Sequence, residues 1–131
     1  MYFSQKTILC YTLIFNIITA VLYSAEENSV VWNNYDVESR LSSESKYITA
    51  KFTCKNLQKN AIDLSVLKVS CGCISVSPKN LRIPYGETAT LDATIDVRLV
   101  TKTETKYILL KSSDSRRPLI RLSVKIYPYQ N

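Results

Sequence analysis

The chain has 131 residues, of which 46% are hydrophobic and 21% charged, and its formal net charge is +6. It contains no histidine, so the commonest general base and the commonest neutral metal ligand are both absent. It contains only 2 glycines, which excludes glycine-rich phosphate loops and flexible glycine linkers. The length predicts a single domain.

Residues 1–24 have the pattern of a secretory signal peptide. Lys6 is the only charged side chain near the start, and it precedes an apolar run, 8–22, that Asn16 interrupts. This run is shorter than a membrane-spanning helix requires. We therefore expect cleavage near Ser24 and an exported protein of the periplasm or cell envelope. An uncleaved membrane anchor is the alternative, and membrane association is expected only in that case.

Removal of the signal leaves 107 residues with a net charge of +5 and three cysteines, Cys54, Cys71 and Cys73. This length is sufficient for one small hydrophobic core. An odd number of cysteines in an exported protein indicates a free thiol, a metal site or an intermolecular disulfide.

Strict alternation of apolar and polar residues dominates the mature chain and predicts half-buried β-strands. The clearest segments are 47–56, 88–97 and 120–126. Further strands are expected around 30–37, over 106–112 and over 62–69, where one extra residue near Val66 predicts a β-bulge. No window of comparable length fits a helix. The pattern predicts an all-β fold, an antiparallel immunoglobulin-like β-sandwich of about seven strands over residues 30–128.

Three motifs follow one another along these strands. The first is Phe52-Thr53-Cys54-Lys55-Asn56, the second is Ser70-Cys71-Gly72-Cys73, and the third is Pro84-Tyr85-Gly86-Glu87. Together they resemble a family of exported bacterial proteins, domain-of-unknown-function family 1573, over roughly residues 30–126. The resemblance implies an immunoglobulin-like domain similar to those of the PapD and major-sperm-protein type. It implies no particular activity.

Cys71 and Cys73 are the candidate disulfide. A Cys-x-Cys spacing places two Cα atoms about 5–7 Å apart, within the range that a disulfide spans. Three alternatives remain open: two packed free thiols, capture of a soft metal such as Cu(I) by two thiolates, and thiol redox chemistry. Cys54 is interpreted as a small buried apolar residue. If 47–56 forms a hairpin with 62–69, Cys54 lies opposite about Leu64 and far from Cys71.

Basic residues are concentrated at the end of the chain, because residues 98–131 carry a net charge of +6 and residues 25–97 a net charge of −1. If the last two strands are neighbours, a basic and aromatic outer face results. The candidate binding residues are Lys68, Tyr107, Lys111, Arg121, Lys125 and Tyr127. Such a face suits an acidic protein or another anionic component of the envelope. The alternative is a solvated sheet face on which lysine prevents aggregation.

Catalytic motifs are missing from the sequence. Asp92 and Asp96 share a strand face, but they are about 13 Å apart along the strand, too far for a catalytic carboxylate pair. We therefore predict a non-enzymatic binding or scaffold module without a cofactor. We expect no nucleic-acid partner, because the sequence carries no recognition motif. The alternative function is thiol-based redox or soft-metal chemistry at Cys71 and Cys73.

The two glycines, Gly72 and Gly86, both lie in the motif turns, and every other turn lacks glycine. We predict that both positions require a backbone geometry that other residues resist. Valine at either position is expected to destabilise the fold more than a typical loop substitution.

Overall fold

The computed structural model describes residues 30–131, and this part of the chain contains nine strands and no helix. The signal-peptide prediction for residues 1–24 lies outside the described residues. The strands are β1 (Val30–Trp32), β2 (Asp36–Arg40), β3 (Tyr47–Asn56), β4 (Ile62–Val69), β5 (Ile74–Ser77), β6 (Asn80–Ile83), β7 (Thr88–Asp96), β8 (Glu104–Ser112) and β9 (Leu119–Tyr127).

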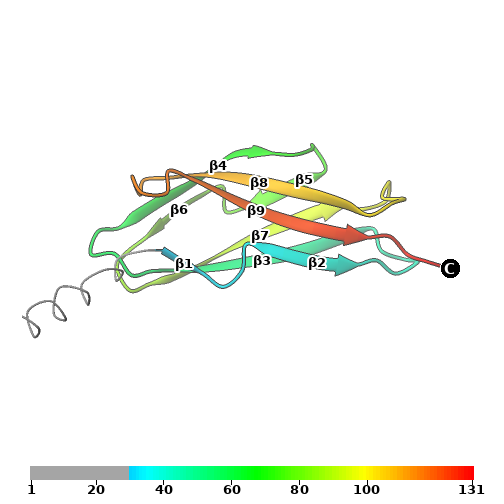
Figure 1. The fold of residues 1–131 in the computed structure, drawn as a ribbon, viewed down its shortest axis with the longest axis horizontal. Coiled ribbons are helices and arrows are strands. Elements are labelled where there is room, and N and C mark those ends of the chain that lie inside the picture. The colour runs from blue at the N-terminus through cyan, green and yellow to red at the C-terminus, as the bar shows by residue number, and fades with distance from the viewer. Residues whose placement is uncertain (1–29) are drawn as a thin grey trace, which may run out of the picture.

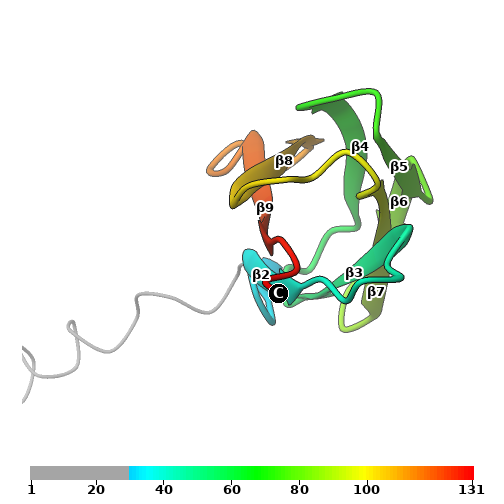
Figure 2. The same cartoon turned by 90° about the vertical axis from the view of Figure 1, so that its right-hand side faces the viewer.

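The strands form two sheets that run along the long axis of the molecule (Figure 1). The four-stranded sheet has the order β1-β3-β7-β5, and the five-stranded sheet has the order β2-β9-β8-β4-β6. Seen end-on in Figure 2, the two sheets curve around a common interior. The fold is therefore the all-β, immunoglobulin-like sandwich that the alternating sequence predicts.

The core is built from the inward-facing residues of both sheets. Phe52 and Ile95 come from the four-stranded sheet, and Leu110 and Leu122 come from the five-stranded sheet; none of the four is exposed to solvent. Their polar neighbours along each strand face outward, as expected from a side-chain period of two. The predicted bulge is confirmed, because the register between β4 and β8 shifts between Val66 and Lys68.

The structure has nine strands where the sequence predicts about seven, because the alternation pattern did not reveal three short strands as separate elements. The expected strand over 30–37 is two strands, β1 and β2, which belong to different sheets. β5 and β6 have only four residues each, too few to show a clear alternation.

The sandwich is also not entirely antiparallel. β2 pairs with β9 in the parallel direction, with Val37 opposite Val124. The reason is topological: after β1 pairs with β3, the chain crosses to the other sheet and continues in the same direction along β9. A parallel pair of this kind depends on distant residues and leaves no local mark in the sequence.

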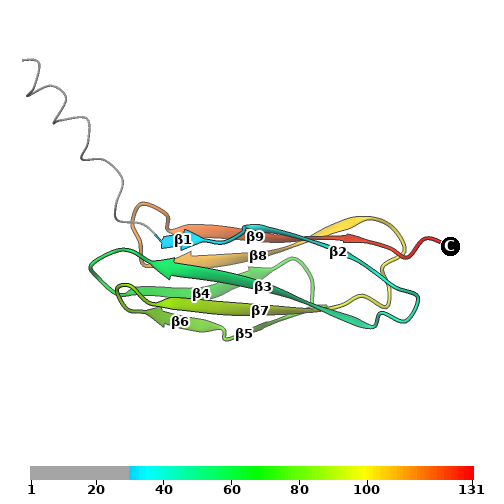
Figure 3. The same cartoon turned by 90° about the horizontal axis from the view of Figure 1, so that it is seen from below.

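The hairpin between 47–56 and 62–69, considered above as a condition for placing Cys54, does not form. β3 pairs with β1 and β7, whereas β4 pairs with β6 and β8 in the other sheet. The connection from Leu57 to Ala61 thus leads from one sheet to the other, and Figure 3, which looks onto the sheets from below, shows it at one end of the molecule. Cys54 pairs with Ala89 and Trp32 rather than Leu64, and it is a buried core residue, as the sequence predicts.

Candidate functional site

The structure brings the six candidate binding residues onto one surface, the outer face of the five-stranded sheet. β8 and β9 are neighbours, with Leu109 opposite Arg121 and Tyr107 opposite Ser123. Lys68 of β4 also lies opposite Leu109, so it belongs to the same face. Since directly opposed residues of paired strands share a face, all six side chains point to the same side of the sheet.

Aromatic rings hold several of these cations in place. The guanidinium of Arg121 lies 4.8 Å from the ring centroid of Tyr107. The Tyr127 ring is approached by Arg40 at 4.7 Å and by the Lys125 ammonium at 5.1 Å. Cation–π contacts at exposed sites are each worth about 0.5–1 kcal/mol. They orient the cations without neutralising their charge.

β2 changes the charge of this face in a way that sequence reasoning missed. Its parallel pairing with β9 places Glu38 opposite Lys125 and Asp36 opposite Ser123. The Tyr127 hydroxyl donates a hydrogen bond to Glu38 Oε1 at 3.2 Å, and the Ser123 hydroxyl donates to Asp36 Oδ1. The hydrogen bond with Tyr127 and the charge of Glu38 raise the pKa of Lys125. The β2 side of the face is therefore mixed in charge.

The middle of the face remains basic. Lys68, Lys111 and Arg121 have no acidic partner within 4.0 Å among residues 30–131, whereas Arg82 of β6 is paired with Asp63 at 2.9 Å. Leu119, which is 56% exposed, lies opposite Lys111. We call this set the central basic patch; its members are Lys68, Tyr107, Leu109, Lys111, Leu119 and Arg121.

A shallow open depression lies beside the central basic patch, at the edge formed by β4, β6 and β8. Its volume is about 420 Å³. It is lined by the polar residues Ser65, Asn80 and Lys111 and the Asp63–Arg82 ion pair, together with the apolar Leu64 and Leu81. The face is therefore not flat, and it offers hydrogen-bond donors and acceptors next to an unpaired lysine.

The Cys-Gly-Cys turn joins β4 to β5 and so passes from one sheet to the other. The Cα atoms of Cys71 and Cys73 are 5.2 Å apart with their sulfur atoms adjacent, and both side chains pack against the core. This placement fits a local disulfide and equally fits two packed thiols, so the disulfide stays a prediction. No cluster of three or more potential metal ligands occurs in residues 30–131.

The two glycines differ in their backbone geometry. Gly86 has a φ of +77°, in the left-handed region that favours glycine. Its N–H donates to Asn56 O at 2.7 Å, which holds the turn in this conformation. Gly72 does not have such a φ, and an added Cβ would meet no atom within 4 Å. The sequence predicts that both positions require a backbone geometry that other residues resist. The observed φ values support this for Gly86 and not for Gly72.

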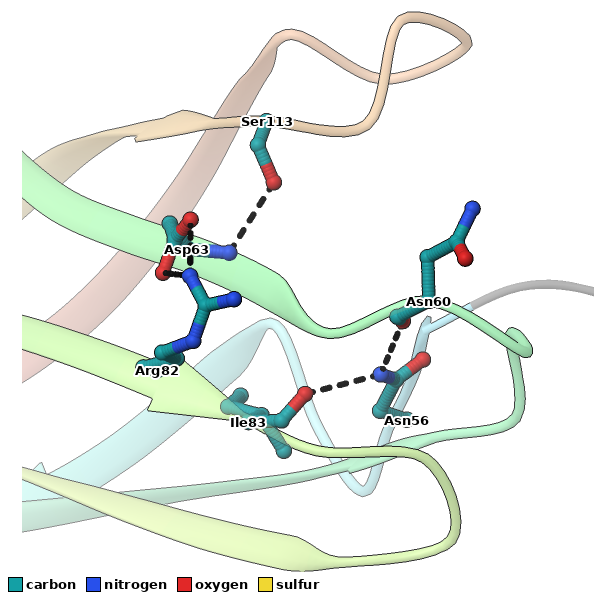
Figure 4. A network of polar contacts seen from close by, with 6 residues as sticks. All are labelled: Asn56, Asn60, Asp63, Arg82, Ile83 and Ser113. Carbon is teal, nitrogen blue, oxygen red and sulfur yellow. Dashed lines mark hydrogen bonds and ion pairs between the residues drawn. The ribbon is translucent and has the colours of Figure 1, made fainter.

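Asn56, at the end of the first sequence motif, is a buried polar residue whose role the sequence did not reveal. Figure 4 shows its side-chain amide donating to Asn60 O at 2.9 Å and to Ile83 O at 2.8 Å. Its Oδ1 accepts from the N–H of Gln58 at 2.8 Å. The side chain thereby ties the β3–β4 connection to β6, and its role is structural.

The comparison with known families identifies the chain. The model of a family described as a protein of unknown function, DUF1573, matches residues 30–126. The chain belongs to this family. The resemblance carried by the three motifs is thus confirmed, and the match covers almost the whole described structure. No curated protein matches the sequence.

Solved structures show which fold this DUF1573 domain shares. The ASH/PapD-like domain 7 of human CEP192 is 9% identical, with a TM-score of 0.61, over 82% of this chain and 91% of that one. The periplasmic chaperone SfaE is 11% identical, with a TM-score of 0.59, over 78% of this chain and 59% of that one. At such identities the likeness shows the PapD-like fold alone.

A third similar structure is a complex, the CsuC–CsuE chaperone–tip adhesion subunit pre-assembly complex from Acinetobacter baumannii. The matched chain is 15% identical, with a TM-score of 0.55, over 79% of this chain and 57% of that one. This chain therefore spans a little over half the length of the chaperones that it matches. Like the other two, this likeness at 15% identity shows the fold alone.

Proposed function

We propose that this DUF1573 protein is an exported, non-enzymatic binding module of the bacterial cell envelope, and that its central basic patch captures a protein partner. The observation that carries this proposal is the gathering of Lys68, Lys111 and Arg121 on three adjacent strands without an acidic partner. Lys111 and Arg121 lie on the consecutive strands β8 and β9, whereas Lys68 of β4 joins them only through the pairing of β4 with β8.

The composition of the patch defines the partner. Leu109 and the exposed Leu119 supply apolar area between the cations, and Tyr107 supplies an aromatic ring. Interfaces commonly combine an apolar centre with aromatic and arginine side chains and a polar rim. We therefore infer a folded protein surface with an apolar centre and acidic groups around it. SfaE and CsuC are described as chaperones, and CsuC is captured with an adhesion subunit, which supports a protein partner in general.

The location rests on the amino-terminal pattern. Residues 1–24 carry the signal-like sequence, and SfaE, a structural neighbour, is a periplasmic chaperone. No helix within residues 30–131 is long and apolar enough to cross a membrane. Cell fractionation with determination of the amino-terminal residue tests the location. A protein beginning near Ala25 in the periplasmic fraction is expected, whereas an uncleaved protein in the cytoplasm would contradict it.

The binding proposal is tested by double charge reversal. Lys111→Glu with Arg121→Glu places two acids in the central basic patch. Lys55→Glu with Lys59→Glu changes the net charge equally on exposed residues outside the face. The tagged unmodified protein and the two variants are each cross-linked to their neighbours in intact cells. The proteins captured with each are then identified and compared by mass spectrometry. Partners lost from the patch variant and kept by the control support the proposal; equal capture by both variants contradicts it.

An anionic glycan or lipid partner is a distinct outcome of the same experiment. In that case the patch variant loses binding to anionic phospholipid vesicles or to a sulfated polysaccharide, while the captured proteins are unchanged. Binding of that kind falls steeply with salt, because it depends on exposed charges. It would replace the protein partner proposed here.

A further inference from the structure

Part of the four-stranded sheet has a free edge. β1 pairs with β3 only at Cys54, Lys55 and Asn56, and the N–H of Asn33 then donates to Thr53 O at 2.9 Å. Beyond this point the chain crosses to the other sheet. The amino-terminal part of β3 up to Phe52 is therefore paired with β7 on one side and with no strand on the other, within residues 30–131.

The hydrogen bonds show which residues of β3 face β7. The N–H of Asn56 donates to Glu87 O at 3.0 Å, and Lys46 O accepts from the N–H of Val97 at 3.0 Å. Both bonds lie on the β7 side of β3. Because backbone groups alternate along a strand, the even-numbered residues of β3 are the ones that pair with β7.

The odd-numbered residues accordingly face the free edge. Thr53, another odd-numbered residue, shows the same orientation, because its C=O accepts a hydrogen bond from the N–H of Asn33 on the side away from β7. Tyr47, Thr49 and Lys51 therefore direct three N–H and three C=O groups away from the sheet. These groups form an open strand edge of the kind that pairs with another strand.

We propose that this edge pairs with the same edge of a second copy of the chain, antiparallel, about a two-fold axis at Thr49. The residues of β3 whose backbone groups face the free edge without a strand partner are Tyr47, Thr49 and Lys51, and Thr49 is the central one of the three. In this register Thr49 faces Thr49 of the other copy, and Tyr47 faces Lys51. All six backbone groups of each copy then form hydrogen bonds.

The side chains suit this register. The pair of Tyr47 with Lys51 juxtaposes an aromatic ring and a cation, which is favourable. The central pair of threonines matches the threonine pairs already present between β3 and β7, where Thr53 and Thr90 hydroxyl groups lie 3.1 Å apart. Ile48, which is half-buried, gains a neighbouring strand on its open side.

A lysine on an edge strand often prevents edge-to-edge pairing, and Lys51 has to be considered in this light. In the proposed register, Lys51 does not face a lysine, and Asp92 lies opposite it on β7. The dimer thus avoids a like-charge pair directly across the new strand junction.

The other edges of the two sheets are less suited to self-pairing. β1, β5 and β6 have three or four residues, and Pro78 and Pro84 flank β6. β2 has Glu38 at its midpoint, so that a two-fold axis there would place two glutamates opposite each other. Short, proline-flanked or charged edges resist pairing. The inference is independent of the central basic patch, which lies on the other sheet.

A proline at the axis tests the inference sharply. The N–H of Thr49 faces the free edge, so Thr49→Pro removes no hydrogen bond to β7, and proline is tolerated on an edge strand in that orientation. We expect the purified protein to change from monomer to dimer as its concentration rises in analytical ultracentrifugation, and Thr49→Pro to remain monomeric with a similar melting temperature. A monomer at every concentration, or a dimer that persists in Thr49→Pro, would overturn the inference.

A second variant and a site-specific readout cover the case in which the proline disturbs folding. Thr49→Lys places two ammonium groups opposite each other and should raise the dimer dissociation constant at least about tenfold. Amide hydrogen exchange then locates the contact. Protection of Tyr47, Thr49 and Lys51 should increase with protein concentration, whereas Ile48 and Ala50 are protected at all concentrations. Concentration-independent exchange at the three odd positions would contradict the inference.

Discussion

The Asn56 side-chain amide donates a hydrogen bond to Ile83 O at 2.8 Å, so that β3 of one sheet is joined to β6 of the other. Asn56 is completely buried, and its remaining polar atoms are also paired, with Asn60 O and Gln58 N. A side chain that satisfies three backbone groups in the interior specifies one arrangement of the connecting loops.

We predict that Asn56→Leu lowers the free energy of unfolding by about 2–4 kcal/mol. The substitution leaves the buried Ile83 O without a partner, at a cost of about 1–3 kcal/mol, and also removes the partly buried hydrogen bonds with Asn60 O and Gln58 N. Urea unfolding followed by tryptophan fluorescence measures the change. Asn60→Ala is the control, because Asn60 contributes its backbone carbonyl, and it should cost less than about 0.5 kcal/mol. Equal losses for both variants would contradict the structural role of the Asn56 side chain.

Alanine substitution separates the two glycines. Gly86→Ala places a side chain at a φ of +77° and should cost about 1–2 kcal/mol. Gly72→Ala meets no atom within 4 Å at ordinary φ and should change stability by less than about 0.5 kcal/mol. Thermal unfolding of the two variants side by side gives the comparison. A larger loss of stability for Gly72→Ala than for Gly86→Ala would show that the need for glycine comes from the Cys-Gly-Cys turn rather than from a positive φ.

Cys54 should be unreactive in the folded protein. Burial raises the pKa of its thiol to about 11, an effect that a backbone hydrogen bond with Ala89 only partly opposes. The thiolate, which is the reactive form, is therefore scarce at neutral pH. Iodoacetamide followed by peptide mass spectrometry should label Cys54 in urea and leave it unlabelled in buffer. Rapid labelling of Cys54 in buffer would show that this part of the core opens.

Asp114 should contribute stability that is lost in acid. Burial by itself raises its pKa, but hydrogen bonds from the Arg116 backbone, Gln58 and the Arg116 guanidinium outweigh burial and lower it. A lowered folded-state pKa gives stability that is present above the unfolded-state value, about 3.9, and is lost as the pH falls through the folded-state value.

Urea unfolding between neutral pH and pH 2 tests this dependence. Asp114→Asn retains the shape of the side chain but cannot titrate, so the acid-induced loss of stability should be smaller than in the unmodified protein. Asp63→Asn is a matched control, because Asp63 is an exposed partner in an ion pair with Arg82. A profile for Asp114→Asn that parallels the unmodified protein would contradict the assignment.

The sequence predicted the residues of the candidate site only in part, because some of them reach the site through a pairing between distant segments. Alternation within β8 and β9 was sufficient to place Tyr107, Lys111, Arg121 and Lys125 on one face. The charge of the face also depends on Asp36 and Glu38, which reach it through a parallel pairing with β9 across more than 80 residues of chain. No local pattern marks such a pairing, so the acidic side of the face could not be anticipated.

The sequence by itself determined the all-β class, the inward residues of each long strand, the bulge after Val66 and membership of the DUF1573 family through its three motifs. These features depend on side-chain periodicity and turn chemistry, which are local. The tertiary structure alone decided that β1 and β2 lie in different sheets, that Asn56 joins the sheets, and that β3 keeps a free edge centred on Thr49. Each of these depends on which distant segments become neighbours, and that choice is made by burial of the whole core at once.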